Sequence, residues 1–169
     1  MYAIVKDNKI EKTGTLKQLF PTTSFAGGIA NKDFKTAENV KQIAYAEVKD
    51  RKYYFVTQGD VELVDGVPTQ QYTNTAKRLE DETKDGVTNQ GLKTVMTAEV
   101  KDTANKLLAK TDWMVIRKYE RDVAIPSATA TYRAAVITEC ARLETAIANA
   151  ADVDALKTVM QGQSWPTED

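Results

Sequence analysis

The sequence contains no histidine and a single cysteine. Without an imidazole side chain, a protein has no Ser-His-Asp or Cys-His catalytic group, no histidine that changes charge near neutral pH and no histidine-rich zinc site. One thiol cannot close an internal disulfide. The metal sites that the composition still permits are those for hard ions bound by carboxylate or carbonyl oxygens. These absences exclude histidine-dependent catalysis and histidine- or cysteine-rich metal sites, and we predict no catalytic, cofactor-binding or metal-binding residue in the chain.

An excess of either charge is also missing. The chain has 23 basic and 24 acidic side chains, a formal net charge of -1. Nucleic-acid binding depends on many lysine and arginine contacts to phosphates, so this balance argues against a nucleic-acid partner. No apolar run approaches the roughly 20 residues that span a bilayer, and the N-terminus lacks the pattern of a signal peptide. We expect a soluble protein that is made in a cytoplasm and has no membrane partner.

Large hydrophobic side chains are few. Hydrophobic residues make up 42% of the chain, but aromatic residues only 8%, and much of the remainder is alanine. A single compact domain of this length would bury about two thirds of the surface of its unfolded chain. The shortage of large side chains favours a partly extended protein that completes its core against a neighbouring molecule.

Residues 1–75 have the alternating period of β-strands. A polar turn at residues 6–9 separates two short apolar segments. Asp65 and Gly66 separate two alternating runs, which is the strongest hairpin signal in the sequence because both central positions of a type I′ turn need positive φ. Residues 15–29 have the composition of a loop. Together these patterns predict a small antiparallel β-meander.

Residues 76–162 have the period of α-helices. Residues 76–85 are charged, with Arg78 and Glu82 spaced to pair on one helix face. Apolar side chains then recur at steps of three and four in two longer segments, which predicts two helices, one running to about Ala109 and one beginning after Pro126. The two apolar stripes are Leu92, Met96, Val100, Ala104, Leu107 and Leu108, and then Tyr132, Val136, Cys140, Leu143 and Ile147.

A short third helix completes the helical part. Asp152 is placed to cap its N-terminus and Gly162 to end it. Residues 163–169 form an aperiodic tail. The predicted fold is therefore α+β: a small N-terminal β-meander in a β-rich module at residues 1–75, followed by a C-terminal helical hairpin with a short third helix in residues 76–162.

Carboxylate pairs are the candidates for bond-cleaving chemistry. Asp60 with Glu62, or the run from Glu80 to Glu82, would suit a glycosidase if two carboxyl groups faced each other across a cleft at about 5 to 10 Å. With 24 acidic residues among 169, such neighbours also arise by chance on a solvated surface. Cys140 lies on an apolar stripe, which favours core packing over nucleophilic chemistry.

Three segments carry motifs in a recognisable order. Residues 16–25 read Leu-Lys-Gln-Leu-Phe-Pro-Thr-Thr-Ser-Phe, residues 61–67 read Val-Glu-Leu-Val-Asp-Gly-Val, and residues 107–113 read Leu-Leu-Ala-Lys-Thr-Asp-Trp, followed by Tyr132 and Arg133. In this order they resemble the tail fibre assembly and tail assembly chaperone-like group of small bacteriophage tail proteins, encoded near tail fibre genes. Pro68 departs from the relatives, which commonly have a large residue there, and its missing N–H predicts an edge strand.

The resemblance implies a non-enzymatic role and carries over no catalytic residue. Two roles stay open. One is a structural or fibre-attachment component of the virion tail, made in the host cytoplasm and docked in an oligomeric assembly to tail fibre, baseplate or hub subunits. The other is an assembly chaperone that is absent from the finished particle. From another class, the alternative is a carboxylate-dependent, glycan-cleaving tail enzyme.

Six residues are candidates for contact with a partner. They are Phe20, Phe25, Trp113, Tyr132, Arg133 and Trp165. Trp113 is expected to fold back over the last apolar turn of the first long helix, so that its removal would leave a cavity costing about 3 kcal/mol or more. Arg133 could pair with Asp112 or Glu120, or remain free on the surface. Trp165, in the aperiodic tail, is as suited to partner contact as to packing.

Overall fold

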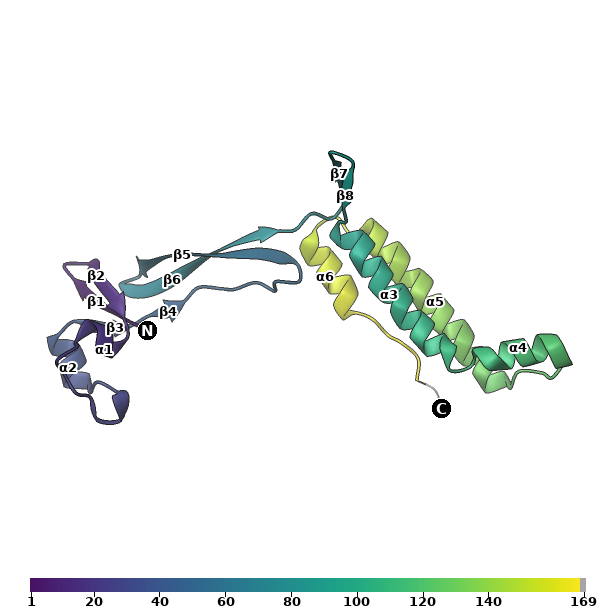
Figure 1. Ribbon diagram of the computed structural model, residues 1–169, viewed down its shortest axis with the longest axis horizontal. Coiled ribbons are helices and arrows are strands. Elements are labelled where there is room, and N and C mark those ends of the chain that lie inside the picture. Colours follow the sequence, from purple (N-terminus) through teal and green to yellow (C-terminus); the bar gives the residue numbers. More distant parts are fainter. Residues whose placement is uncertain (168–169) are drawn as a thin grey trace. The chain divides into compact units, whose positions relative to one another are not determined.

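The computed structural model of the chain describes residues 1–167. It contains six α-helices and several small sheets, which confirms the α+β class. The chain divides into two compact units, Met1–Thr75 and Ala76–Asp169. The first unit holds most of the strands and the second most of the helical residues (Figure 1). The last two residues of the predicted tail, 168 and 169, lie outside the described residues.

Helices and strands are interleaved in both units. The first unit contains β1 (Tyr2–Lys6), β2 (Lys9–Gly14), α1 (Leu16–Leu19), the 3-10 turn η1 (Ala26–Gly28), α2 (Lys32–Ala37), β3 (Val40–Gln42), β4 (Ala44–Tyr45), β5 (Tyr54–Val64) and β6 (Val67–Ala76). The second contains β7 (Glu82–Lys84), β8 (Val87–Asn89), α3 (Leu92–Ala109), α4 (Asp112–Arg121), α5 (Ser127–Asn149) and α6 (Val153–Gln161).

The predicted hairpin at residues 6–9 is confirmed. β1 and β2 pair antiparallel, and the two turn residues, Asp7 and Asn8, have φ of 50° and 56°. β3 pairs antiparallel with the other side of β1, so the strand order of this sheet is β2-β1-β3. The strands therefore form separate sheets rather than one meander, because the chain folds into short helices between β2 and β3.

The turn at Asp65 and Gly66 is also confirmed, since their φ angles are 50° and 75°. It joins β5 to β6 in a second sheet, whose strand order is β4-β6-β5. β6 is thus the central strand, and the prediction that Pro68 marks an edge is wrong. β4 pairs with β6 at Thr69 and Gln70, beyond the proline, so the missing N–H does not interrupt this pairing.

Residues 15–29 are not a plain loop. Thr15 forms a capping box with Gln18 that begins α1, since the Thr15 side chain accepts from the Gln18 N–H and the Gln18 side chain accepts from the Thr15 N–H at 2.8 Å. This places Leu16 in a buried cluster with Ala30 and Val40. A second cluster, centred on Ala3, Val5 and Ile43, packs against Val61 and Leu63 of β5 and so joins the two sheets.

Residues 76–85 are not helical and instead form an irregular segment that leads into β7. Arg78 and Glu82 form the expected ion pair, but they do so beside the β7–β8 hairpin. The carbonyls of Arg78 and Leu79 accept from the first N–H groups of α3, at 2.9 and 3.0 Å, so this segment caps a helix instead of forming one. Gly91 is needed at this contact, because an added Cβ would clash with the Leu79 carbonyl.

The two predicted long helices are α3 and α5, and they pack along each other (Figure 1). α3 ends at Ala109 as predicted. The largest fully buried hydrophobic side chains of this unit lie on the predicted stripes and on α6: Met96, Val100, Val136, Leu143, Ile147 and Leu156. The Asp152 side chain accepts from the Ala155 N–H at 2.7 Å, which confirms the predicted cap of the third helix, α6.

Candidate docking surface on helix α4

Helix α4 follows α3 and precedes α5 along the chain, where the sequence predicts a connection. It begins at Asp112, whose carboxylate favours a helix N-terminus, and ends before Asp122, which has a left-handed φ of 54°. The apolar residues Trp113, Ile116 and Tyr119 recur every three positions. That spacing is itself a signal for a further helix, in addition to the two long ones and the short third helix predicted above.

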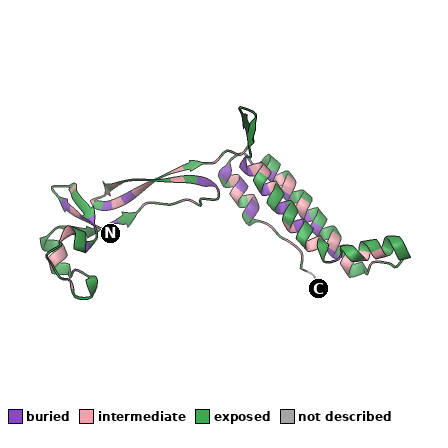
Figure 2. Ribbon diagram, viewed as in Figure 1, coloured by how far each residue is buried: buried purple, intermediate pink, exposed green. Residues whose placement is uncertain are grey.

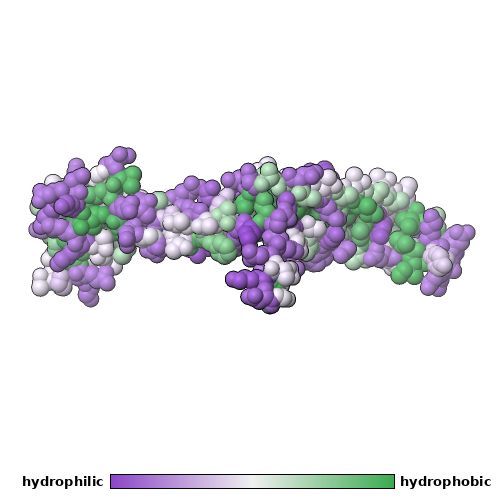
Figure 3. All heavy atoms as spheres, turned by 90° about the horizontal axis from the view of Figure 1, so that it is seen from above, coloured by the Kyte–Doolittle hydropathy of each residue, from purple (hydrophilic) through white to green (hydrophobic). Residues whose placement is uncertain are grey.

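Every residue of α4 is at least partly exposed, whereas α3 and α5 alternate buried and exposed positions (Figure 2). Trp113 is 52%, Ile116 is 56% and Tyr119 is 93% exposed. Trp113, Ile116 and Tyr119, spaced three apart on one side of the helix, form what we term the α4 face. Figure 3 shows hydrophobic residues at the surface near this end of the helical unit. Amphipathic helices normally bury this side, so the α4 face is an unusual feature.

The prediction that Trp113 folds back over α3 is wrong. The chain turns at Lys110 and Thr111 and begins a new helix at Asp112, so Trp113 stands in the first turn of α4 and over half of it is exposed. Its ring is covered on one side by the guanidinium of Arg117, 4.8 Å from the ring centroid. Such a cation–π contact contributes about 0.5 to 1 kcal/mol at an exposed site, far less than core packing.

Arg133 of α5 fixes the junction between α3 and α4. Its Nη1 donates to the Leu108 carbonyl at 2.9 Å and to the Thr111 Oγ1 at 2.7 Å, and its Nη2 lies 2.9 Å from the Asp112 Oδ1. Of the three possibilities that the sequence left open, the ion pair with Asp112 is the one formed. Only 17% of the Arg133 side chain is exposed. We call this arrangement the Arg133 clamp.

The Arg133 clamp satisfies both helix ends at once. The last carbonyls of α3 lack intrahelical donors and carry partial negative charge, which a guanidinium complements. Asp112 complements the positive N-terminus of α4. The clamp thereby joins Thr111 and Asp112 of the Thr-Asp-Trp motif to Arg133 of the Tyr-Arg motif at the start of α4.

Tyr132 and Trp165 belong to the interior of the helical unit. Tyr132 is buried with Ala104 and Val136, and Trp165 packs against the same cluster. The Trp165 Nε1 donates to the Gln163 Oε1 at 2.8 Å. The structure thus brings Tyr132 together with Trp165 in a core, and places Trp113 apart on an exposed face.

A buried carboxylate holds the tail that carries Trp165. Glu139, 8% exposed, accepts from the Ser164 N–H and from two nitrogens of Arg142, each at 2.7 Å. Arg142 also donates to the Gly162 carbonyl at 3.0 Å. The hydrogen bond from Arg142, followed by that from Ser164, lowers the pKa of Glu139 against the opposing effect of burial.

We predict a pH-dependent release of this tail. Because the folded pKa of Glu139 is lowered, its contribution to stability is complete above the ordinary glutamate pKa and is lost as pH falls through the folded value. Trp165 fluorescence, measured in a Trp113→Phe background, should change in that acidic range. Glu139→Gln should remove the transition. An identical acid transition in the Glu139→Gln variant would contradict the assignment.

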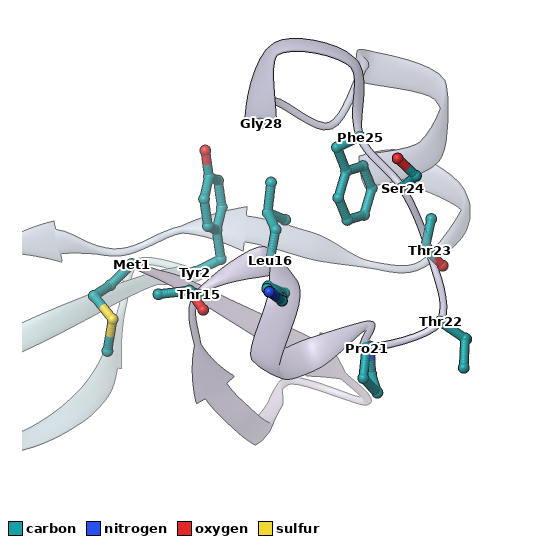
Figure 4. Close-up of a pocket in the computed structure, with 11 residues that line it drawn as sticks. Met1, Tyr2, Thr15, Leu16, Pro21, Thr22, Thr23, Ser24, Phe25 and Gly28 are labelled. Atoms are coloured by element: carbon teal, nitrogen blue, oxygen red, sulfur yellow. The ribbon is translucent and has the colours of Figure 1, made fainter.

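Phe20 and Phe25 lie together in the first unit, in a partly buried triad with Phe34. The ring centroids of Phe20 and Phe25 are 5.0 and 5.1 Å from that of Phe34, in edge-on geometry. Beside the triad is a pocket of about 560 Å³, bordered by Tyr2, Leu16 and Phe25 and by the hydroxyl-bearing residues 22–24 (Figure 4). Both phenylalanines pack against the buried cluster of Leu16, Ala30 and Val40, and Phe25 also lines the pocket.

The candidate carboxylates in the run from Glu80 to Glu82 have structural contacts. Asp81 accepts from the Gly91 N–H at 2.7 Å, and this hydrogen bond, with a further one from Thr94, lowers the pKa of Asp81. Glu80 lies 2.7 Å from the Lys93 Nζ. Burial, followed by the neighbouring Glu144, raises the pKa of the Cys140 thiol, which disfavours the thiolate.

Within residues 1–167, no three acidic or cysteine side chains lie close enough together to hold a metal ion. In the same part of the chain, no helix is long and apolar enough to cross a membrane. No family model, curated protein or solved structure that we compared with the chain matches it.

Proposed function

We propose that this chain is a non-enzymatic protein of the bacteriophage tail, a structural or fibre-attachment component that works by docking to other tail proteins. The observation that carries the proposal is the α4 face, an apolar helix surface turned to solvent and held in direction by the Arg133 clamp. The motif resemblance supplies the tail context, and the residues of its last motif are those that build the clamp and begin α4.

The composition of the α4 face supports protein docking. Tryptophan and tyrosine are enriched among the residues that dominate binding free energy, and such residues cluster at the centre of a contact area. Trp113 and Tyr119 flank Ile116 on one helix side, with Arg117 stacked on the Trp113 ring. A helix of this kind fits the groove of a partner subunit through residues three and four positions apart.

In this proposal each of the two units binds a different neighbour. The β-rich module at residues 1–75 and the helical hairpin of α3 and α5, with α6 as its third helix, act as separate modules, and the docking residues lie on the second. A protein that links two neighbours in an assembly has use for two such modules, because each can hold a different subunit.

An assembly chaperone remains the second candidate, because the α4 face is as suited to holding a fibre subunit before assembly as after it. Mass spectrometry of purified particles separates the two roles. Peptides of this chain in stoichiometric amounts are expected for a tail component. Their absence from particles, with binding to the fibre subunit in extracts, would replace our first proposal by the second.

We predict that Trp113→Ala and Ile116→Asp leave the melting curve nearly unchanged but lower incorporation into particles by roughly 30-fold or more, the effect of losing a residue that dominates binding. Quantitative immunoblotting of purified particles after complementation measures this. The matched control is Val87→Asp on β8, since Val87 is 63% exposed but lies off the α4 face. Normal incorporation of both α4 variants would refute the proposal.

A further inference from the structure

The pocket of the first unit is built mainly by the first of the three sequence motifs, residues 16–25. Leu16 and Lys17 of α1 border the pocket, and so do residues 21–25 of the loop that follows. Its volume of about 560 Å³ lies within the range of roughly 300 to 1,000 Å³ that is usual for ligand sites. The motif therefore encloses enough space to admit side chains of another molecule.

The polar lining of the pocket consists of hydroxyl groups and one positive charge. Residues 22–24, Thr-Thr-Ser, each bring a hydroxyl, and Lys17 brings an ammonium group. Within residues 1–167, these four side chains have no hydrogen-bond or ion-pair partner. The Lys35 Nζ, 5.5 Å from the centroid of the Tyr2 ring, adds a second positive charge nearby. None of the described residues that line the pocket is acidic, so the lining favours a negatively charged group.

The remaining walls of the pocket are apolar and already held in place. Leu16 is 5% exposed and belongs to a buried cluster. The Phe25 ring is fixed by its edge-on contact with Phe34. Figure 4 shows the Tyr2 ring and the Leu16 side chain pointing in the same direction, with the Phe25 ring across from them. An apolar side chain that entered here would leave water for a preformed apolar surface, which is favourable.

A carboxylate suits this lining better than a neutral sugar does. Each hydroxyl of a sugar donates a hydrogen bond and so needs an acceptor, and the strong side-chain acceptors are carboxylate and amide oxygens. The described residues that line the pocket carry neither group. An ionised carboxylate only accepts hydrogen bonds, so it matches the three hydroxyls and the Lys17 ammonium group.

We propose that this pocket binds an extended segment of a neighbouring protein in which a large apolar side chain stands next to an aspartate or glutamate. The apolar side chain enters between Tyr2 and Phe25. The carboxylate pairs with Lys17 and accepts from the hydroxyls of residues 22–24. This inference rests on the proposed docking function, and it gives the first unit a contact of its own with a neighbour, as the α4 face does for the second.

Short peptides blocked at both ends test the proposal with the purified full chain. The probes are acetyl-Gly-Phe-Asp-Gly-amide, the same peptide with Asn in place of Asp, and the same peptide with Ala in place of Phe. In a heteronuclear NMR titration, the first peptide should shift the amide signals of residues 16–28. The Asn peptide should bind roughly five-fold and the Ala peptide roughly ten-fold more weakly. Unshifted signals at millimolar peptide, or equal binding of the Asp and Asn peptides, would overturn the proposal.

Lys17→Gln tests the charged contact and should reduce binding of the Asp peptide to the level of the Asn peptide. The matched control is Lys12→Gln, because Lys12 of β2 is also exposed but does not line the pocket, so this variant should bind normally. Full binding by Lys17→Gln, or equal loss in both variants, would overturn the proposal. Ile116→Asp on α4 should leave peptide binding unchanged, so failure here and failure of the proposed docking function are separate results.

Discussion

Leu143→Ala is expected to lower the free energy of unfolding of the helical unit by about 3 to 5 kcal/mol. Leu143 lies on the buried stripe of α5 and is 0% exposed. Removing its branched side chain loses hydrophobic transfer energy and leaves a cavity that two long packed helices cannot readily close. Because a domain of this size has a total stability of about 5 to 15 kcal/mol, the change is a large fraction of the whole. Urea unfolding followed by far-UV circular dichroism measures it.

Ile137→Ala on the same helix is the matched control. Ile137 is 56% exposed, so its truncation should change the free energy of unfolding by no more than about 0.5 kcal/mol. Both substitutions replace a four-carbon aliphatic side chain by alanine in a helix interior, so they differ mainly in burial. Equal destabilisation by the two variants would show that the Leu143 side chain is not packed between helices.

The long helices were predictable because their apolar residues must meet a partner surface. Leu143 and Met96 are buried at the positions that the repeat at three and four residues assigns to a core. Asp152 was predictable as a cap because its carboxylate satisfies a local N–H group within three residues. These features depend on neighbours in the sequence, or on a pattern long enough to average over exceptions.

Other features were not predictable because they depend on distant contacts. Arg78 and Leu79 are not helical, since their carbonyls accept from the first N–H groups of α3, more than ten residues away. Pro68 is tolerated in the central strand β6 because β4 pairs with β6 at Thr69 and Gln70, past the proline, and so needs no N–H group from it. Periodicity identifies one apolar side of a helix but not what covers it, so it does not distinguish a Trp113 packed on α3 from an exposed one.

The candidate site was predictable in part. The spacing from Asp112 to Arg133 suggested the ion pair, because the two helices were expected to meet at that end. The sequence did not indicate that Arg133 also binds the Leu108 carbonyl, since every residue carries a carbonyl and only the position of the helix end makes this one available to a side chain of another helix. That contact turns a surface pair into the Arg133 clamp.

Arg133→Ala is expected to destabilise the helical unit by about 2 to 4 kcal/mol and to loosen α4 more than α3 or α5. The main loss is of the two charged hydrogen bonds to the Leu108 carbonyl and Thr111, since such bonds contribute about 1.5 to 3 kcal/mol each when their partners are shielded from water. The pair with Asp112 adds little because that carboxylate is 55% exposed. Hydrogen exchange with mass spectrometry should show faster exchange of α4 amides.

Two companion variants separate geometry from charge in the Arg133 clamp. Arg133→Lys keeps the charge but replaces the planar guanidinium by a single nitrogen, so it cannot make all three contacts and should recover only part of the stability. Asp112→Asn should cost well under 1 kcal/mol, because the exposed ion pair contributes little. If Arg133→Lys restored full protection of α4, charge alone would set the helix direction. If Arg133→Ala left α4 exchange unchanged, the clamp would not hold the α4 face in place, and the shared basis of the Thr-Asp-Trp and Tyr-Arg motifs would lie elsewhere.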